Sequence, residues 1–154
     1  MTIERIYIGA TPGAPLVECE QIRVVAGKGI EGDRNFGLHH EPGQNITLIE
    51  AEEIEAFISE HPRRHDLSIT RRNLVTRGVR LTELIGLEFM VGAVRLRGVA
   101  LCEPCLGLGN ALATTDHPPA LVVKRFMHRA GLNADVLSGG VVQRGAAVRV
   151  SPPR

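Results

Sequence analysis

The sequence is poor in aromatic residues and has little net charge. It contains no Trp, one Tyr and four Phe among 154 residues. Proteins that bind single-stranded nucleic acids stack bases on aromatic rings, so this scarcity argues against that class. With 18 basic and 17 acidic residues, the formal net charge is +1, which gives no field to draw the protein onto duplex nucleic acid or an anionic membrane. We expect neither as a partner.

Cysteines and long apolar runs are also scarce. Three cysteines, an odd number, argue against a secreted disulfide scaffold. The N-terminus, MTIER, lacks the basic and then apolar layout of a signal peptide. No apolar run approaches the roughly 18 residues that a membrane span requires. These observations predict a soluble protein of the reducing cytoplasm.

What is present is the composition of a globular protein, with 44% hydrophobic and 23% charged residues. The length suits a single domain over residues 1–154. The 17 glycines and 9 prolines fall between short apolar and β-branched runs, a pattern typical of short strands joined by tight turns. We predict strands at residues 3–9, 21–25, 45–48, 87–91, 93–101, 134–137 and 146–150.

Two segments have the pattern of helices. The first follows an acidic stretch that starts at Glu50, and it ends by Pro62. The second spans about residues 118–129, with Thr115 or Asp116 as its N-terminal cap. A barrel hides its strand edges without helical cover. We therefore predict a mainly β fold, a curled or closed β-barrel of about seven strands with two or so peripheral helices.

The strongest local feature is Cys102-Glu103-Pro104-Cys105, directly after the predicted strand 93–101. Its thiols have four interpretations: half of a zinc site, a redox pair, two buried apolar side chains, or one reactive or metal-binding thiolate. Zinc would need ligands from distant parts of the chain. A redox pair normally opens a helix, whereas the glycine-rich sequence after Cys105 predicts a flexible segment. Cys105 is the better exposed candidate for a single functional thiolate.

Two other segments could contact a ligand. Residues 27–37 are rich in glycine, so their backbone could approach an anion closely, with Lys28 and Arg34 supplying charge. The alternative is a long turn capped by Asp33. In residues 71–78, two arginines followed by Asn73 suit a phosphate or the edge of a heterocycle. A solvated run of surface charge explains that pattern equally well.

The order of these features resembles that of a MOSC domain. The matching segments are GIEGDR at 29–34, QNITLI at 44–49 before an acidic helix, RNLVTRG at 72–78, LIG at 84–86, CEPC at 102–105 and a glycine-bounded stretch at 131–140. Together they span about residues 5–150. The MOSC domain occurs at the C-terminus of molybdenum-cofactor sulfurases and in mitochondrial amidoxime-reducing components and their bacterial relatives.

The resemblance implies a β-barrel-rich fold and a functional cysteine, and Cys105 best matches the family position. In relatives that bind a pterin-based molybdenum cofactor, this cysteine ligates the metal, and in sulfurases a sulfur-carrying cysteine has been proposed. Cys105 is therefore the expected catalytic residue and molybdenum ligand. The residues expected to bind the cofactor around it are Asp33, Arg34, Arg72, Asn73 and Cys102.

Three functions stay open at this point: reductase activity on N-hydroxylated substrates, sulfur carrying, and a barrel without cofactor whose cysteines are buried. A cysteine desulfurase or an external electron-transfer protein would be the partner, because the sequence has no iron–sulfur cysteine cluster and no flavin or haem signature. Pyridoxal phosphate is not expected, because neither Lys28 nor Lys124 lies in a convincing setting for an aldimine.

Overall fold

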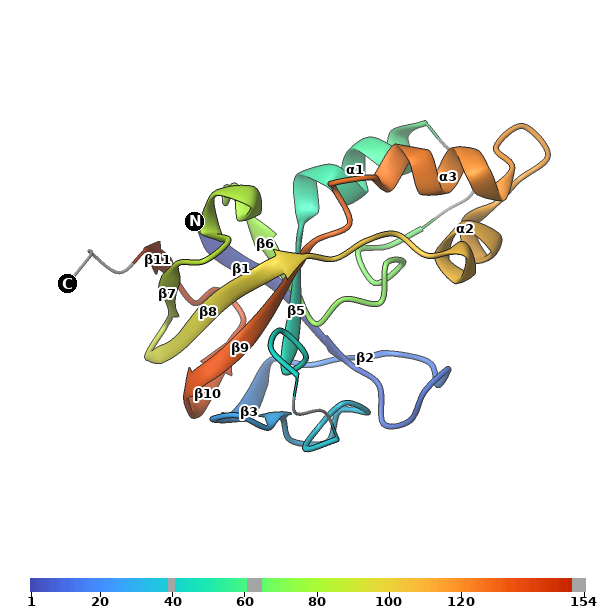
Figure 1. Cartoon of the computed structure of the whole chain (residues 1–154). Coiled ribbons are helices and arrows are strands. Elements are labelled where there is room, and N and C mark those ends of the chain that lie inside the picture. The colour runs from blue at the N-terminus through green and yellow to red at the C-terminus, as the bar shows by residue number, and fades with distance from the viewer. Residues whose placement is uncertain (39–40, 61–64, 151–154) are drawn as a thin grey trace.

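A computed structural model describes residues 1–38, 41–60 and 65–150 (Figure 1). The strands are β1 (Thr2–Ile8), β2 (Val17–Glu18), β3 (Gln21–Val25), β4 (Gly29–Ile30), β5 (Ile46–Glu50), β6 (Leu74–Arg77), β7 (Glu88–Val91), β8 (Val94–Leu101), β9 (Leu132–Ser138), β10 (Gly140–Gln143) and β11 (Val148–Val150). The helices are α1 (Ala51–Ser59), α2 (Leu106–Leu112), α3 (Pro119–Phe126) and the short 3₁₀-helix η1 (Leu81–Leu84). Among these residues, no helix is long and apolar enough to cross a membrane.

Eight strands form one curled sheet in the order β11-β7-β8-β9-β5-β6-β1-β2. All neighbours are antiparallel except β5 and β6, which α1 connects as a β-α-β unit. The sheet curls far enough for its ends to meet, since a bridge joins Thr2 to Ala147 and the Val148 amide donates to the Met1 carbonyl at 2.9 Å. The other strands form a small sheet in the order β10-β3-β4.

The inner face of the curled sheet holds the main core. Leu48 of β5 pairs in register with Leu132 of β9 and with Leu74 of β6, and all three side chains are fully buried in one cluster. Because side chains alternate along a strand, the residues next to these leucines point to the outer face. This alternation determines where polar side chains can gather.

The three helices gather at one end of the sheet, with α1 and α3 side by side (Figure 1). The rings of Phe57 in α1 and Phe126 in α3 lie with centroids 4.8 Å apart. Their cluster also contains Cys102 and Leu112. The helices therefore cover the part of the outer face where β8 leads into α2.

The mainly β, barrel-like fold predicted from the sequence is confirmed. Each of the seven predicted strands is present, β3 with the predicted ends and the other six with shifted ends, while β2, β4, β6 and β10 were not predicted. Two details were wrong. Residues 106–109, expected to be flexible, begin helix α2, because Leu108 and Leu112 pack on the Phe57 cluster and this packing outweighs the low helix propensity of glycine. The predicted cap of the second helix, Thr115 or Asp116, was also wrong, because Pro118 occupies the N-cap position of α3 and no side chain caps it.

Candidate functional site

A line of polar side chains crosses the outer face of β9, β5 and the start of β6. Asn133 of β9 is the register partner of Thr47 of β5. The Asn73 amide donates to the Thr47 hydroxyl at 3.0 Å, and the Thr47 amide donates to Asn73 Oδ1 at 3.2 Å. At one end of the line, the Cys102 thiol donates to Asn133 Oδ1 at 3.0 Å. We call Cys102, Asn133, Thr47 and Asn73 the polar row.

Asp33 is a buried anchor at the other end of the polar row. Its side chain is 1% exposed and accepts hydrogen bonds from the Gly9 amide at 3.0 Å and from Arg34 Nη1 at 3.1 Å. Asn73 Nδ2 donates to the Tyr7 carbonyl at 3.1 Å and lies 3.5 Å from Asp33 Oδ1. Buried polar groups need such partners. Asp33 and Asn73 thus fasten the end of β1 to the start of β6.

Three arginines lie next to the residues of this anchor in the sequence, Arg34 after Asp33 and Arg71 and Arg72 before Asn73, and each already makes a hydrogen bond. Arg34 Nη2 donates to the Arg71 carbonyl at 3.0 Å, and Arg71 Nη2 donates to the Ala14 carbonyl at 2.7 Å. Arg72 donates from Nε to the Ala130 carbonyl at 2.9 Å. For the two terminal nitrogens of Arg72, the described part of the chain shows no hydrogen bond. Arg72 is therefore the arginine best able to receive a phosphate or carboxylate.

Thr70 adds a second unsatisfied group beside these arginines. It is 3% exposed, and its hydroxyl has no hydrogen-bond partner within residues 1–38, 41–60 and 65–150. A buried hydroxyl without a partner is costly and uncommon. The neighbouring Arg71 has a φ of 60°, a backbone conformation that side chains other than glycine seldom adopt. Segment 70–72 therefore carries backbone strain and an unused hydrogen-bonding group, as functional sites often do.

Cys102 is a buried thiol. It is 3% exposed, and its backbone amide donates to the Gly131 carbonyl at 2.8 Å. Burial raises the pKa of the Cys102 thiol above its ordinary value, the positive charge of Arg72 opposes this rise, and Glu103 adds to it. Cys102 therefore remains protonated at neutral pH and suits its role as a donor to Asn133.

Cys105 is exposed, three residues further on. It occupies the N-cap position of α2, and its sulfur accepts a hydrogen bond from the Leu108 amide at 3.4 Å. The Cys105 carbonyl also accepts from the Gly109 amide at 3.1 Å. The helix that the sequence did not predict thus holds this thiol in a defined position at the surface.

The described residues contain no group of three or more His, Cys, Asp or Glu side chains that could hold a metal ion.

The structure brings several of the predicted site residues together. Asp33, Arg34 and Asn73 form the buried anchor, while Arg72 lies close enough to Cys102 to affect its titration. Sequence reasoning missed Thr47, Thr70 and Asn133, which complete or flank the polar row. The sequence pattern could have identified two of them, because Thr47 and Asn133 are polar residues that alternate with buried apolar ones along β5 and β9. No local pattern marked Thr70.

Comparison with known proteins identifies a family and a shared fold. The MOSC domain family model matches residues 35–149. The YuaD protein from Bacillus subtilis has the same fold, with a TM-score of 0.83 at 21% identity over 99% of this chain and 96% of that one. YiiM from Escherichia coli gives a TM-score of 0.71 at 16% identity over 100% and 71% of the two chains. YiiM from Geobacillus stearothermophilus gives 0.71 at 17% identity over 98% and 75%.

Among curated proteins, no sequence matches this chain. At the identities just given, the solved structures establish a shared fold and nothing about activity. The family model, in contrast, covers more than half of the chain, from the loop after the Asp33 anchor to β11. This match shows that the chain belongs to the MOSC domain family.

Proposed function

We propose that this protein binds a pterin-based molybdenum cofactor, with the Cys105 thiolate as its ligand to the metal. The observation that carries the proposal is the position of Cys105, an exposed thiol held by α2 three residues after Cys102, the end of the polar row near which Arg72 lies. Molybdenum accepts soft sulfur ligands, and arginine pairs well with phosphate. Membership of the MOSC family supports the same cofactor.

The residues present fit such a group. Arg72 has terminal nitrogens without a hydrogen bond in the described chain, and Thr70 has a buried hydroxyl without a partner there. Both could bind polar atoms of the cofactor. Arg34 and Asn73 would support the site without contacting the cofactor, because their side chains already bond to Asp33 and to backbone carbonyls. We therefore assign them to holding segment 70–73 in position for the cofactor.

Each thiol then has a separate task. Cys105 binds the metal, and the Leu108 amide keeps its sulfur in place. Cys102 stays protonated and orients Asn133. When bound, molybdenum supplies two-electron redox chemistry, which would serve a cytoplasmic reductase of N-hydroxylated substrates. An external electron-transfer protein would provide the electrons.

Sulfur carrying is the second candidate, and the exposure of Cys105 favours it. The Cys105 thiolate would attack the outer sulfur of a persulfide on a cysteine desulfurase, and the desulfurase thiolate would leave. An exposed thiol is needed for this attack, because the partner's persulfide must reach it.

The deciding experiment measures molybdenum in protein purified from a host that makes the cofactor. We expect near-stoichiometric metal in the unaltered protein, loss of metal in Cys105→Ser, and retention of at least half in Cys102→Ser. Circular dichroism confirms that both variants fold. Equal loading of Cys105→Ser and the unaltered protein would refute Cys105 as the ligand. A Cys105-dependent persulfide in metal-free protein, detected by mass spectrometry, would instead establish the carrier function.

A further inference from the structure

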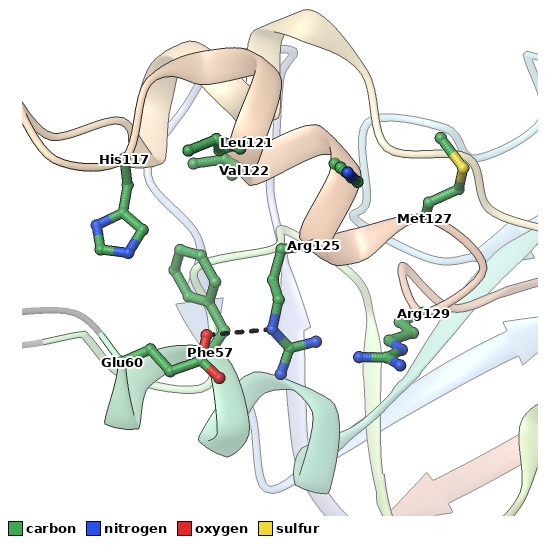
Figure 2. A pocket seen from close by; sticks show the side chains of 9 residues that line it. Phe57, Glu60, His117, Leu121, Val122, Arg125, Met127 and Arg129 are labelled. Carbon is green, nitrogen blue, oxygen red and sulfur yellow. Dashed lines mark hydrogen bonds and ion pairs between the residues drawn. The ribbon is translucent and has the colours of Figure 1, made fainter.

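A groove between α1 and α3 has no role in the function proposed above. Its volume is about 470 Å³, within the range of roughly 300–1,000 Å³ typical of small-molecule sites. Figure 2 shows Phe57 of α1 below and Leu121 and Val122 of α3 above, with Met127 at one end. None of the polar-row residues, Cys105 or the three arginines of the anchor lines it.

Two large apolar side chains that line this groove are exposed to solvent, although α3 packs on the core. Leu121 and Met127 are both 48% exposed, whereas Phe57 and Val122 beneath them are buried. Exposing two large apolar side chains beside a concave surface costs free energy that an apolar ligand would recover. The groove therefore favours an occupant with an apolar body.

The rim of the groove is positively charged. Lys124, Arg125 and Arg129 line it, against a single carboxylate, Glu60. Arg125 already has an ionic partner, since its Nε donates to Glu60 at 3.3 Å, as Figure 2 shows. Arg129 lies at 3.9 Å from Glu53 and is half exposed. For Lys124, no ion pair is found within the described residues. The rim thus retains positive charge after its internal pairs are counted.

We propose that this groove binds a small carboxylic acid with an aromatic or aliphatic body. The body would lie against the exposed Leu121 and Met127, above the buried Phe57 and Val122, and the carboxylate would face Lys124. Complementarity of charge favours an acid, because a carboxylate gains an ion pair with the exposed Lys124 ammonium that a neutral ligand lacks, and a cation would be repelled by Lys124 and Arg129.

The groove and the proposed cofactor site have no lining residue in common, although one apolar cluster lies next to both. Phe57 and Val122 belong to the same apolar cluster as Cys102, but Cys102 does not line the groove. A bound acid would therefore contact α1 and α3 without touching the polar row. Binding of the acid does not depend on whether the protein carries molybdenum.

The test uses 3-phenylpropionate as the probe, titrated into ¹⁵N-labelled protein at neutral pH. We expect saturable shifts of the backbone amides of α3 and of Phe57, with a Kd of about 1 mM or tighter. Lys124→Gln should weaken binding about five-fold. The matched control is Lys28→Gln, because Lys28 is the other lysine of the chain and is exposed, remote from this groove. Leu121→Asn should weaken binding by a similar factor through loss of apolar contact.

The neutral analogue 3-phenylpropanol separates charge from apolar burial, and we expect it to bind at least five-fold more weakly than the acid. The proposal is overturned if these amides do not shift, if the alcohol binds as tightly as the acid, or if Lys28→Gln weakens binding as much as Lys124→Gln does. All of these readouts are independent of molybdenum content, so a failure here leaves the proposed function untouched.

Discussion

At the scale of single residues, the two thiols of the CEPC segment show how burial separates groups that look equivalent in the sequence. Cys102 is buried and donates to Asn133, while Cys105 is exposed at the N-cap of α2. The sequence favoured Cys105 because it precedes glycines. The structure gives a different reason for its exposure, since Cys102 enters the Phe57 cluster and the chain then turns outward to start α2.

We predict that Cys105 reacts with N-ethylmaleimide at least ten times faster than Cys102 in the native protein at neutral pH. Burial excludes the reagent from Cys102 and raises its thiol pKa, so little thiolate is present. Peptide mapping by mass spectrometry follows each cysteine separately. In urea the two rates should become similar, and faster modification of Cys102 in the native state would contradict the assignment.

We also predict that Asn73→Ala destabilises the protein by about 2–4 kcal/mol, because it leaves the Thr47 amide and the Tyr7 carbonyl without their buried partner. The matched control is Asn110→Ala, an exposed position in α2, where we expect a change within about 0.5 kcal/mol. Urea unfolding followed by circular dichroism measures both. Equal stability of the two variants would mean that the Asp33 anchor contributes little to folding.

At the scale of elements, α2 is the clearest difference between expectation and structure. Two glycines in seven residues make a poor helix in isolation. The helix forms because the backbone of Gly109 packs closely on α3. A Cβ added at Gly109 would lie 2.8 Å from the Pro119 carbonyl oxygen, whereas one at Gly107 would meet only the Cys105 sulfur at 3.5 Å. Glycine is thus needed for packing at one position and not at the other.

This contrast gives a paired prediction. Gly109→Ala should destabilise the protein by about 1–3 kcal/mol, since α2 must move away from α3. Gly107→Ala should be neutral or stabilise it by up to about 1 kcal/mol, because alanine is the better helix former. Thermal unfolding of both variants provides the measurement. If both substitutions stabilise the protein, α2 does not pack on α3 as described.

At the scale of the whole molecule, closure of the curled sheet depends on close backbone approaches that a sequence pattern does not reveal. Gly131 has a φ of +111°, and a Cβ there would lie 2.1 Å from the Leu48 carbonyl oxygen. The site lies where β9 begins, next to the Cys102 amide that donates to the Gly131 carbonyl. The approach of β9 to β5 therefore fixes both the barrel and one end of the polar row.

We predict that Gly131→Ala destabilises the protein by more than about 3 kcal/mol or prevents folding, because a backbone atom cannot move aside cheaply. Gly13→Ala is the matched control: Gly13 also has a positive φ, +78°, but no atom lies within 4 Å of an added Cβ. Its cost should stay near 1–2 kcal/mol, the strain of the backbone alone. Soluble yield and urea unfolding test both variants, and equal effects would show that the close approach is unimportant.

The sequence by itself determined the mainly β class, the positions of seven strands and two helices, and the identity of the chemistry-bearing segments, because strand alternation, turn residues and charge placement are local properties. It also showed which residue types could serve a site, including Cys105 and Arg72.

Only the tertiary structure decided which of these side chains already have hydrogen-bond partners within the protein. Asp33, Arg34 and Asn73 are engaged with one another, while Thr70 was not recognised at all. The reason is physical: hydrogen-bond partners and burial depend on contacts between residues far apart in the chain, such as Asn73 with Asp33 and Cys102 with Asn133, and such contacts exist only once the sheet has curled.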